Sequence, residues 1–201
     1  MRAFIAIDLP ETVRTALRQQ QAELKELLAA ANPTKPKQDS EIQWTNPAGI
    51  HLTLKFLGEI NDAQVQQVNE ALSGLEPFKE FSVEVRGFGF FPSAHRPRVL
   101  WAGIAAPPEL ALLEQRVEEC MEKIGFEREQ RDFNPHLTLA RFKAPRPRPA
   151  LNATVERHIT LSLGSFAVSE FFLFESKLSP RGAEYRRIMS FPQEGVRLGV
   201  T

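Results

Sequence analysis

The pattern of apolar and polar residues changes period along the chain and predicts a mixture of strands and helices. Apolar residues that dominate a short run, or recur at every second position, are typical of strands. We expect strands at residues 2–8, 42–44, 50–57, 81–91, 99–104 and 136–142, one or two within 159–174, and a last one at 185–191. Apolar positions three and four apart predict helices after Pro10, from Asn61 or Asp62, from Pro107 or Pro108 to about Ile124, and near 150–158.

The order of these elements decides the fold class that we expect. Strands and helices are mixed, yet they do not repeat as simple strand–helix–strand units. This order favours an α+β fold with mostly antiparallel sheets over a doubly wound parallel sheet. Residues 32–40 contain two prolines and two lysines but no apolar run, so we expect a loop there.

A duplicated motif is the most informative feature of the sequence. Residues 44–54 and 133–139 each contain an aromatic residue, then Asn-Pro, then His-Leu-Thr-Leu, with three additional residues between Asn-Pro and the histidine in the first copy. Each copy is followed by an expected helix, then a phenylalanine-rich run, then an apolar run introduced by arginine, at residues 98–101 in the first half and 186–189 in the second. We infer two similar lobes related by an approximate two-fold axis, with helices outside and both motifs at a central cleft. Residues 1–201 would then form a single bilobed domain.

The His-x-Thr spacing places two reactive side chains on one face of a strand. Because strand side chains alternate between faces, His51 and Thr53 point the same way while the motif leucines point into the core. His136 and Thr138 repeat this arrangement. Imidazoles with a pKa of about 6.5 can act as general base and general acid, and hydroxyls can donate hydrogen bonds to phosphate oxygens. Two such pairs could open a cyclic phosphate without a metal or another cofactor. The residues alone do not say which histidine donates the proton.

Composition narrows the class of partner. The chain has 201 residues, of which 42% are hydrophobic, and 25 Lys and Arg balance 25 Asp and Glu. Proteins that coat duplexes are usually strongly basic, so we expect any nucleic acid to be bound at a local site. The sequence shows no apolar run of about 20 residues and no signal segment, so we expect no membrane contact and a cytoplasmic protein. We also expect a monomer.

Other residues of possible chemical interest fit structural or surface roles. The sequence has no His-x-x-x-His, Cys-x-x-Cys or Glu-x-x-His cluster, which argues against zinc. We expect His95 in a surface loop, His158 at a helix end and Cys120 on an apolar helix face. Four basic residues in proline-spaced segments either solubilise the chain or form a positive rim that guides an RNA end, namely Lys35, Lys37, Arg146 and Arg148.

At the duplicated motif the sequence resembles the 2H phosphoesterase family, and in particular its LigT-like RNA 2′,3′-cyclic phosphodiesterases. Residues 2–10 resemble the start of that subgroup, residues 51–58 its first motif and residues 136–141 its second. The resemblance covers essentially the whole chain. It implies a bilobed α+β fold and hydrolysis of a 2′,3′-cyclic phosphate at the end of RNA, or of a small cyclic nucleotide, to a 2′-phosphate. It also implies that His51 is the proton donor and His136 the proton acceptor.

Two further residues lie five positions after the histidines. In an ideal strand this odd spacing turns Arg141 away from His136 and Phe56 away from His51, unless a bulge returns them to the same face. The resemblance implies that Arg141 contacts the phosphate or nucleotide, and the alternative is a solvated arginine. Phe56 could stack on a base, and the alternative is an ordinary core residue.

Three other functions remain open on the sequence. The same site run backwards would make an ATP-independent 2′,5′ RNA ligase acting on tRNA halves. A nucleotide-binding module that has lost catalysis is a different class, although both His-x-Thr pairs are intact. A phosphoesterase could instead act on another small substrate such as ADP-ribose 1″,2″-cyclic phosphate.

Overall fold

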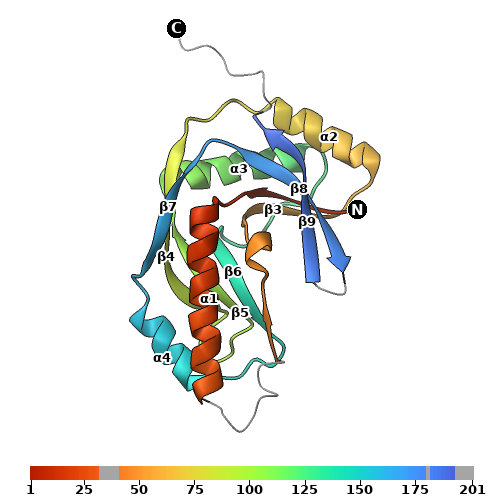
Figure 1. Ribbon diagram of the computed structural model, residues 1–201. Coiled ribbons are helices and arrows are strands. Elements are labelled where there is room, and N and C mark those ends of the chain that lie inside the picture. The colour runs from red at the N-terminus through yellow and green to blue at the C-terminus, as the bar shows by residue number, and fades with distance from the viewer. Residues whose placement is uncertain (32–40, 180–181, 193–201) are drawn as a thin grey trace.

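The computed structural model describes residues 1–31, 41–179 and 182–192 of the chain (Figure 1). The strands within them are β1 (Arg2–Ile7), β2 (Ile42–Trp44), β3 (Leu52–Glu59), β4 (Phe81–Phe91), β5 (Val99–Ala105), β6 (His136–Phe142), β7 (Ser162–Val168), β8 (Phe171–Ser179) and β9 (Gly182–Phe191). The α-helices are α1 (Glu11–Ala31), α2 (Asp62–Ser73), α3 (Pro108–Lys123) and α4 (Pro149–Arg157), and the 3-10 helix η2 spans Pro47–Gly49.

These elements confirm the predicted α+β class with antiparallel sheets. The 159–174 segment contains β7 and the start of β8. The strand predicted to begin at Ile50 begins at Leu52, because η2 and its cap at Ile50 occupy the preceding residues. Asn61 is the residue that caps α2, and its side chain accepts a hydrogen bond from the backbone N–H of Gln64. The loop expected at residues 32–40 lies outside the described residues.

The two sheets exchange strands between the halves of the sequence. One sheet has the order β3-β1-β8-β9 and the other β2-β6-β5-β4-β7. The hairpin β4-β5, which follows the first motif, therefore pairs with β6 of the second motif. The hairpin β8-β9, which follows the second motif, joins the sheet of the first through β1 (Figure 1). Each sheet therefore contains strands from both halves of the chain.

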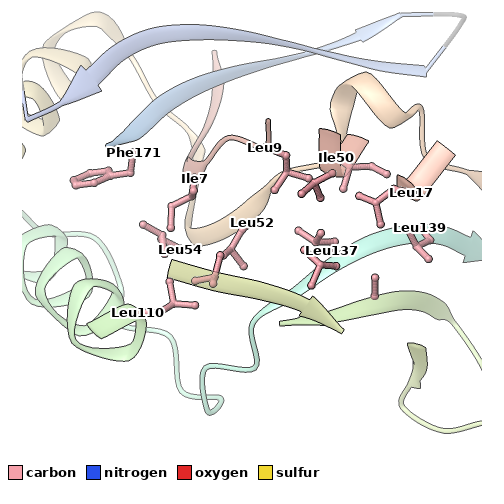
Figure 2. Packing of buried hydrophobic residues seen from close by; sticks show 14 of the residues in the cluster. Ile7, Leu9, Leu17, Ile50, Leu52, Leu54, Leu110, Leu137, Leu139 and Phe171 are labelled. Atoms are coloured by element: carbon pink, nitrogen blue, oxygen red, sulfur yellow. The ribbon is translucent and has the colours of Figure 1, made fainter. Parts of the chain in front are cut away.

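Helices cover each sheet on one side. α2 packs against β9 and α3 against β3, while α1 packs against β7 and α4 against β4. Their apolar faces meet one continuous core that extends between the sheets. The leucines of both motifs belong to this core: Leu52, Leu54, Leu137 and Leu139 are at most 5% exposed and lie together in Figure 2. The predicted inward direction of the leucines is confirmed. The histidine and threonine of each copy therefore point away from the shared core.

Both motif strands carry a bulge at the same position. The register of β1 against β3 skips Leu54, because Ala6 pairs with Thr53 and Ile5 with Lys55. The register of β5 against β6 skips the equivalent Leu139. One extra residue reverses the alternation of faces that follows it. The bulges thus return Phe56 and Arg141, the residues five positions after the histidines, to the faces that carry those histidines.

Candidate active site

Both histidines are oriented by the same backbone contact. His51 Nδ1 lies 2.9 Å from the carbonyl oxygen of Gly49, and His136 Nδ1 lies 2.7 Å from that of Asn134. A carbonyl oxygen can only accept, so Nδ1 carries the proton and donates it in both cases. This leaves Nε2 of each ring free to accept or deliver a proton at a substrate. The contact two residues before each histidine is a feature that the sequence did not reveal.

The two imidazoles have different surroundings. The His51 ring stacks on Phe4 with centroids 4.3 Å apart and meets the edge of Tyr185 at 5.0 Å. Burial lowers the pKa of His51 to about 4, an effect that the Gly49 carbonyl and Asp8 only partly oppose. The His136 ring meets Phe91 edge-on at 4.9 Å. Burial, and to a smaller degree the charge of Arg141, lowers the pKa of His136 from its ordinary value. Both rings are therefore neutral at neutral pH in the unliganded protein.

The threonine hydroxyls complete each pair. Thr53 and Thr138 are half-buried and lie on the same strand faces as the histidines. Among the described residues, no side chain or backbone group forms a hydrogen bond with either hydroxyl. Both hydroxyls are therefore available as donors to a ligand.

The outer part of the site carries the other two predicted residues. Arg141 is exposed, and its guanidinium forms no ion pair or hydrogen bond within the described part of the chain. Its charge acts on His136, as expected for a residue on the same face. Phe56 is 63% exposed and lies 6.2 Å from Phe4. The alternative that Phe56 is an ordinary core residue is therefore wrong. Its large apolar ring is exposed to solvent near the first histidine.

The two motif copies are joined through α1. The backbone N–H of Thr45 donates to the carbonyl of Leu139 at 2.9 Å. The amide of Gln21, which is 2% exposed, donates to the carbonyls of both Thr45 and Leu139 at 2.9 Å. β3 and β6 also contact each other directly. The segment that leads to His51 is thus attached to the bulge that follows His136 and Thr138.

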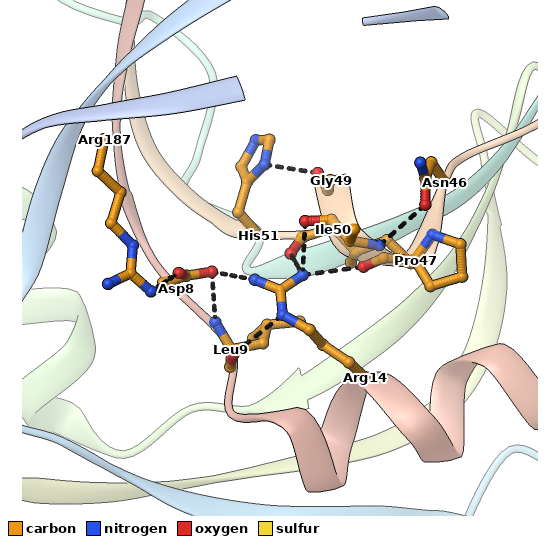
Figure 3. A network of polar contacts seen from close by, with 10 residues as sticks. Asp8, Leu9, Arg14, Asn46, Pro47, Gly49, Ile50, His51 and Arg187 are labelled. Atoms are coloured by element: carbon orange, nitrogen blue, oxygen red, sulfur yellow. Dashed lines mark hydrogen bonds and ion pairs between the residues drawn. The ribbon is translucent and has the colours of Figure 1, made fainter. Parts of the chain in front are cut away.

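Arg14 holds the loop that orients His51 (Figure 3). Its guanidinium donates to the carbonyls of Pro47, Ala48 and Ile50 at 2.8, 2.9 and 3.0 Å. It also forms an ion pair with Asp8, which accepts a second ion pair from Arg187. The fork of a guanidinium suits several carbonyls at once. Sequence reasoning missed this network, because the carbonyls that Arg14 holds before His51 are more than thirty residues away and no local pattern marks them.

The remaining candidates have structural or surface positions. His95 is exposed, as expected for a surface loop. His158 ends α4, and its Nδ1 contacts the carbonyl of Thr154 at 2.8 Å. The Cys120 thiol is only partly buried and donates to the carbonyl of Ala71.

The basic segment around residue 147 is mainly structural. Arg146 and Arg148 both pair with Glu41, and the buried Arg148 also lies over the ring of Phe142. Neither of the two readings made from the sequence, solubilising charge or a rim for RNA, describes Arg148. Lys35 and Lys37 lie outside the described residues.

The described ranges contain neither a metal-binding cluster nor a membrane-spanning helix. No group of three or more His, Cys, Asp or Glu side chains there is arranged to hold a metal ion. None of the helices described is both long and apolar enough to cross a membrane.

Comparisons with known proteins identify the family that this chain resembles. The model of the LigT like phosphoesterase family matches residues 7–101 and 104–185. An RNA 2′,3′-cyclic phosphodiesterase of Methanothermobacter thermautotrophicus is 33% identical over 189 residues, covering 92% of this chain and 95% of that protein. One from Archaeoglobus fulgidus is 33% identical over 191 residues, covering 95% of this chain and 99% of that protein.

Solved structures show the same fold. A crystal structure of a Thermus thermophilus protein superimposes with a TM-score of 0.73 at 30% identity, covering 95% of this chain and 97% of that one. Escherichia coli LigT in complex with 3′-AMP gives the same TM-score at 23% identity, covering 96% and 98%. With both motifs intact and the match extending over most of its length, the chain belongs to the LigT like phosphoesterase family.

Proposed function

We propose that this protein hydrolyses 2′,3′-cyclic phosphodiester ends of RNA or nucleotides to 2′-phosphomonoesters, by acid–base catalysis between two histidines and without a metal. The observation that carries the proposal is the duplicated contact of each Nδ1 with the carbonyl two residues earlier. It fixes two imidazoles with free Nε2 atoms, one just before β3 and one at the start of β6, and these two strands contact each other. The curated relatives named RNA 2′,3′-cyclic phosphodiesterase support the choice of substrate.

In the proposed reaction the phosphate lies between the two Nε2 atoms. His136 accepts a proton from water, and the resulting hydroxide attacks phosphorus. The bond between phosphorus and O3′ breaks, and His51 delivers a proton to O3′, which leaves the phosphate on O2′. Thr53 and Thr138 donate hydrogen bonds to the non-bridging oxygens, where negative charge increases in the transition state. The assignment of donor and acceptor follows the family resemblance.

This assignment places a requirement on His51. With its pKa lowered to about 4, the free protein holds His51 neutral, whereas a proton donor must start protonated. The negative charge of a bound phosphodiester raises the pKa of a neighbouring imidazole. Substrate binding is therefore expected to bring a proton to His51. His136 needs no such change, because a base must start neutral.

The outer residues would hold the nucleotide. The free guanidinium of Arg141 is suited to a phosphate oxygen, and its exposed position keeps it accessible. The exposed ring of Phe56 offers a surface on which a base can stack. Both lie on the faces of the catalytic histidines, one on each motif strand.

The test is hydrolysis of adenosine 2′,3′-cyclic phosphate by His51→Ala and His136→Ala. Each substitution should lower kcat by about 10²–10⁴-fold, the usual contribution of one positioned acid or base. His95→Ala, which removes an exposed loop histidine, is the matched control and should retain wild-type turnover. Chromatography should identify the product as the 2′-phosphate, and excess EDTA should leave the rate unchanged. Wild-type turnover by either catalytic variant would reject the two-histidine mechanism.

A further inference from the structure

A cavity of about 360 Å³ adjoins His136 and is not used by the proposed reaction. Its lining includes Gly103, Trp101, Phe91, Ile159 and Arg86 as well as His136. The lining includes neither Thr138 nor Arg141, and it includes no residue of the first motif. The volume is near the lower end of the roughly 300–1,000 Å³ typical of small-molecule sites, which suits a single nucleotide unit.

Glycines shape this cavity. Gly103 pairs with His136 across the sheet, and its missing side chain lets the Arg86 carbonyl and the Trp101 ring lie close against β5. A Cβ on Gly103 would lie 2.7 Å from the carbonyl oxygen of Arg86 and 3.2 Å from the Trp101 ring. Gly87 has a positive φ of 71° in the bulge of β4, and its N–H donates to Leu161. This contact holds the segment after α4 against β4 and places Ile159 at the rim.

The chemistry of the lining combines apolar walls with one free cation. Trp101 and Phe91 pack together with ring centroids 5.2 Å apart, and Ile159 is 66% exposed although it is a large apolar residue. Arg86 is exposed and has no ion pair or hydrogen bond within the described ranges. Flat apolar surfaces beside an unpaired guanidinium are typical of sites for a base attached to a phosphate.

The position of the cavity relative to the catalytic groups shows which nucleotide it suits. Along β6, His136 pairs with Gly103 whereas Arg141 pairs with Val99 at the other end. The Gly103 end of the cavity and Arg141 therefore lie in opposite directions along the strand from the Thr138 position, while Phe91, which pairs with Val99, extends the cavity wall back towards the Arg141 level. A terminal nucleotide whose base lies towards Arg141 and Phe56 would direct its 5′ side towards Gly103.

We propose that this cavity binds the nucleotide immediately upstream of the cyclic phosphate, on the same RNA strand. Its base lies against Trp101 and Ile159, and Arg86 contacts the phosphodiester that joins it to the terminal nucleotide. This inference rests on the proposed function. It makes the protein a reader of RNA ends at least two nucleotides long, in preference to cyclic mononucleotides.

The first experiment compares two substrates, adenosine 2′,3′-cyclic phosphate and the dinucleotide ApA with the same cyclic end. Arg86→Gln and Ile159→Ser should each lower the ratio of kcat/KM for the dinucleotide to that for the mononucleotide about tenfold, as expected for the loss of one phosphate or stacking contact. Arg18→Gln removes an equal charge from an exposed position on α1 and should leave the ratio unchanged. An unchanged ratio in both cavity variants would overturn the proposal.

A second experiment measures ligand binding in the cavity independently of catalysis. The chain has two tryptophans. Trp44 contacts Lys25 of α1 and lies on the face of the sheet opposite the face that carries Trp101. Trp44→Phe therefore leaves Trp101 as the only indole reporter. ApA ending in a 2′-phosphate should change the Trp101 fluorescence at concentrations about tenfold lower than adenosine 2′-phosphate does. The reason is the one additional stacking contact that the upstream base makes.

The outcomes separate the two proposals. If the wild type hydrolyses neither cyclic substrate but the fluorescence still prefers the dinucleotide, the proposed function fails while the cavity assignment stands. Equal responses to mononucleotide and dinucleotide would overturn the cavity assignment. A response to ApA without a terminal phosphate equal to that of ApA ending in a 2′-phosphate would also overturn it, because binding in the cavity would then not depend on the phosphate that places the upstream nucleotide there.

Discussion

The role of Arg14 in placing His51 leads to a prediction with a magnitude that the structure supports. Arg14→Ala removes three hydrogen bonds to the carbonyls before His51, one to the carbonyl of Leu9 and the ion pair with Asp8. Hydrogen bonds from a charged donor each contribute roughly 1.5–3 kcal/mol, and neighbouring ones are not additive. Because the Ala48 contact is exposed, water can replace it. We expect a loss of about 3 kcal/mol in the free energy of unfolding, equivalent to about two of these bonds.

The catalytic consequence should exceed what lost stability alone would produce. Without Arg14, η2 is free to move, and the Gly49 carbonyl that fixes the tautomer of His51 moves with it. A shift of about 1 Å at such a group can cost about 10²-fold in rate. The charge of Arg14 also lowers the pKa of His51, so its removal should raise that pKa above about 4.

The assay is a titration of His51 by long-range ¹H–¹⁵N NMR, together with kcat on a cyclic nucleotide at a temperature where the variant is folded. The spectra report the pKa and the protonated nitrogen separately. Arg18→Ala, one helical turn further along α1 in an exposed pair with Glu11, is the matched control. Arg14→Lys should rescue little, since an ammonium group cannot reproduce the planar fork. An unchanged His51 tautomer and pKa, with kcat within about twofold of wild type, would refute the reasoning.

Three further predictions address stability, pH and base stacking. Lys55→Met should destabilise the protein by about 3–5 kcal/mol in urea unfolding, because it leaves the buried Glu118 without its cation 2.6 Å away. The double variant Lys55→Met/Glu118→Leu should recover most of this loss. Equal losses of stability in the single and double variants would contradict the prediction. Between the ordinary pKa of histidine and about 4, His51 stays neutral in the folded state but is protonated in the unfolded state. The free energy of unfolding should therefore fall by up to roughly 3 kcal/mol as the pH drops through this range. A His51→Gln variant should lack this part of the acid sensitivity, and parallel pH profiles would refute the shift. Phe56→Ala should change stability by less than about 0.5 kcal/mol, because the ring is exposed, yet raise KM for a cyclic nucleotide about tenfold; an unchanged KM would exclude stacking.

The sequence predicted the elements and the chemical groups because both depend on local patterns. Apolar spacing located the helices and strands, and the strand period placed His51 and Thr53 on the face opposite Leu52. The duplicated motif identified both candidate pairs without any tertiary information. Apart from the comparison of the two motif copies, these inferences needed only residues within one strand or one helical turn of each other.

Only the tertiary structure decided how these pieces meet. The pairing of β4-β5 with β6, and of β8 with β1, joins segments far apart in the sequence, and several sheet orders would satisfy the same apolar pattern. The bulge at Leu54 depends on the register against β1, so the face of Phe56 could not be read from its spacing. The contacts of Arg14 and the burial of His51 arise from folded neighbours on other elements. The sequence by itself determined which side chains could perform proton transfer. The folded backbone two residues before each histidine determined its tautomer, and long-range packing determined its pKa and the cavity beside His136, because burial comes from other elements.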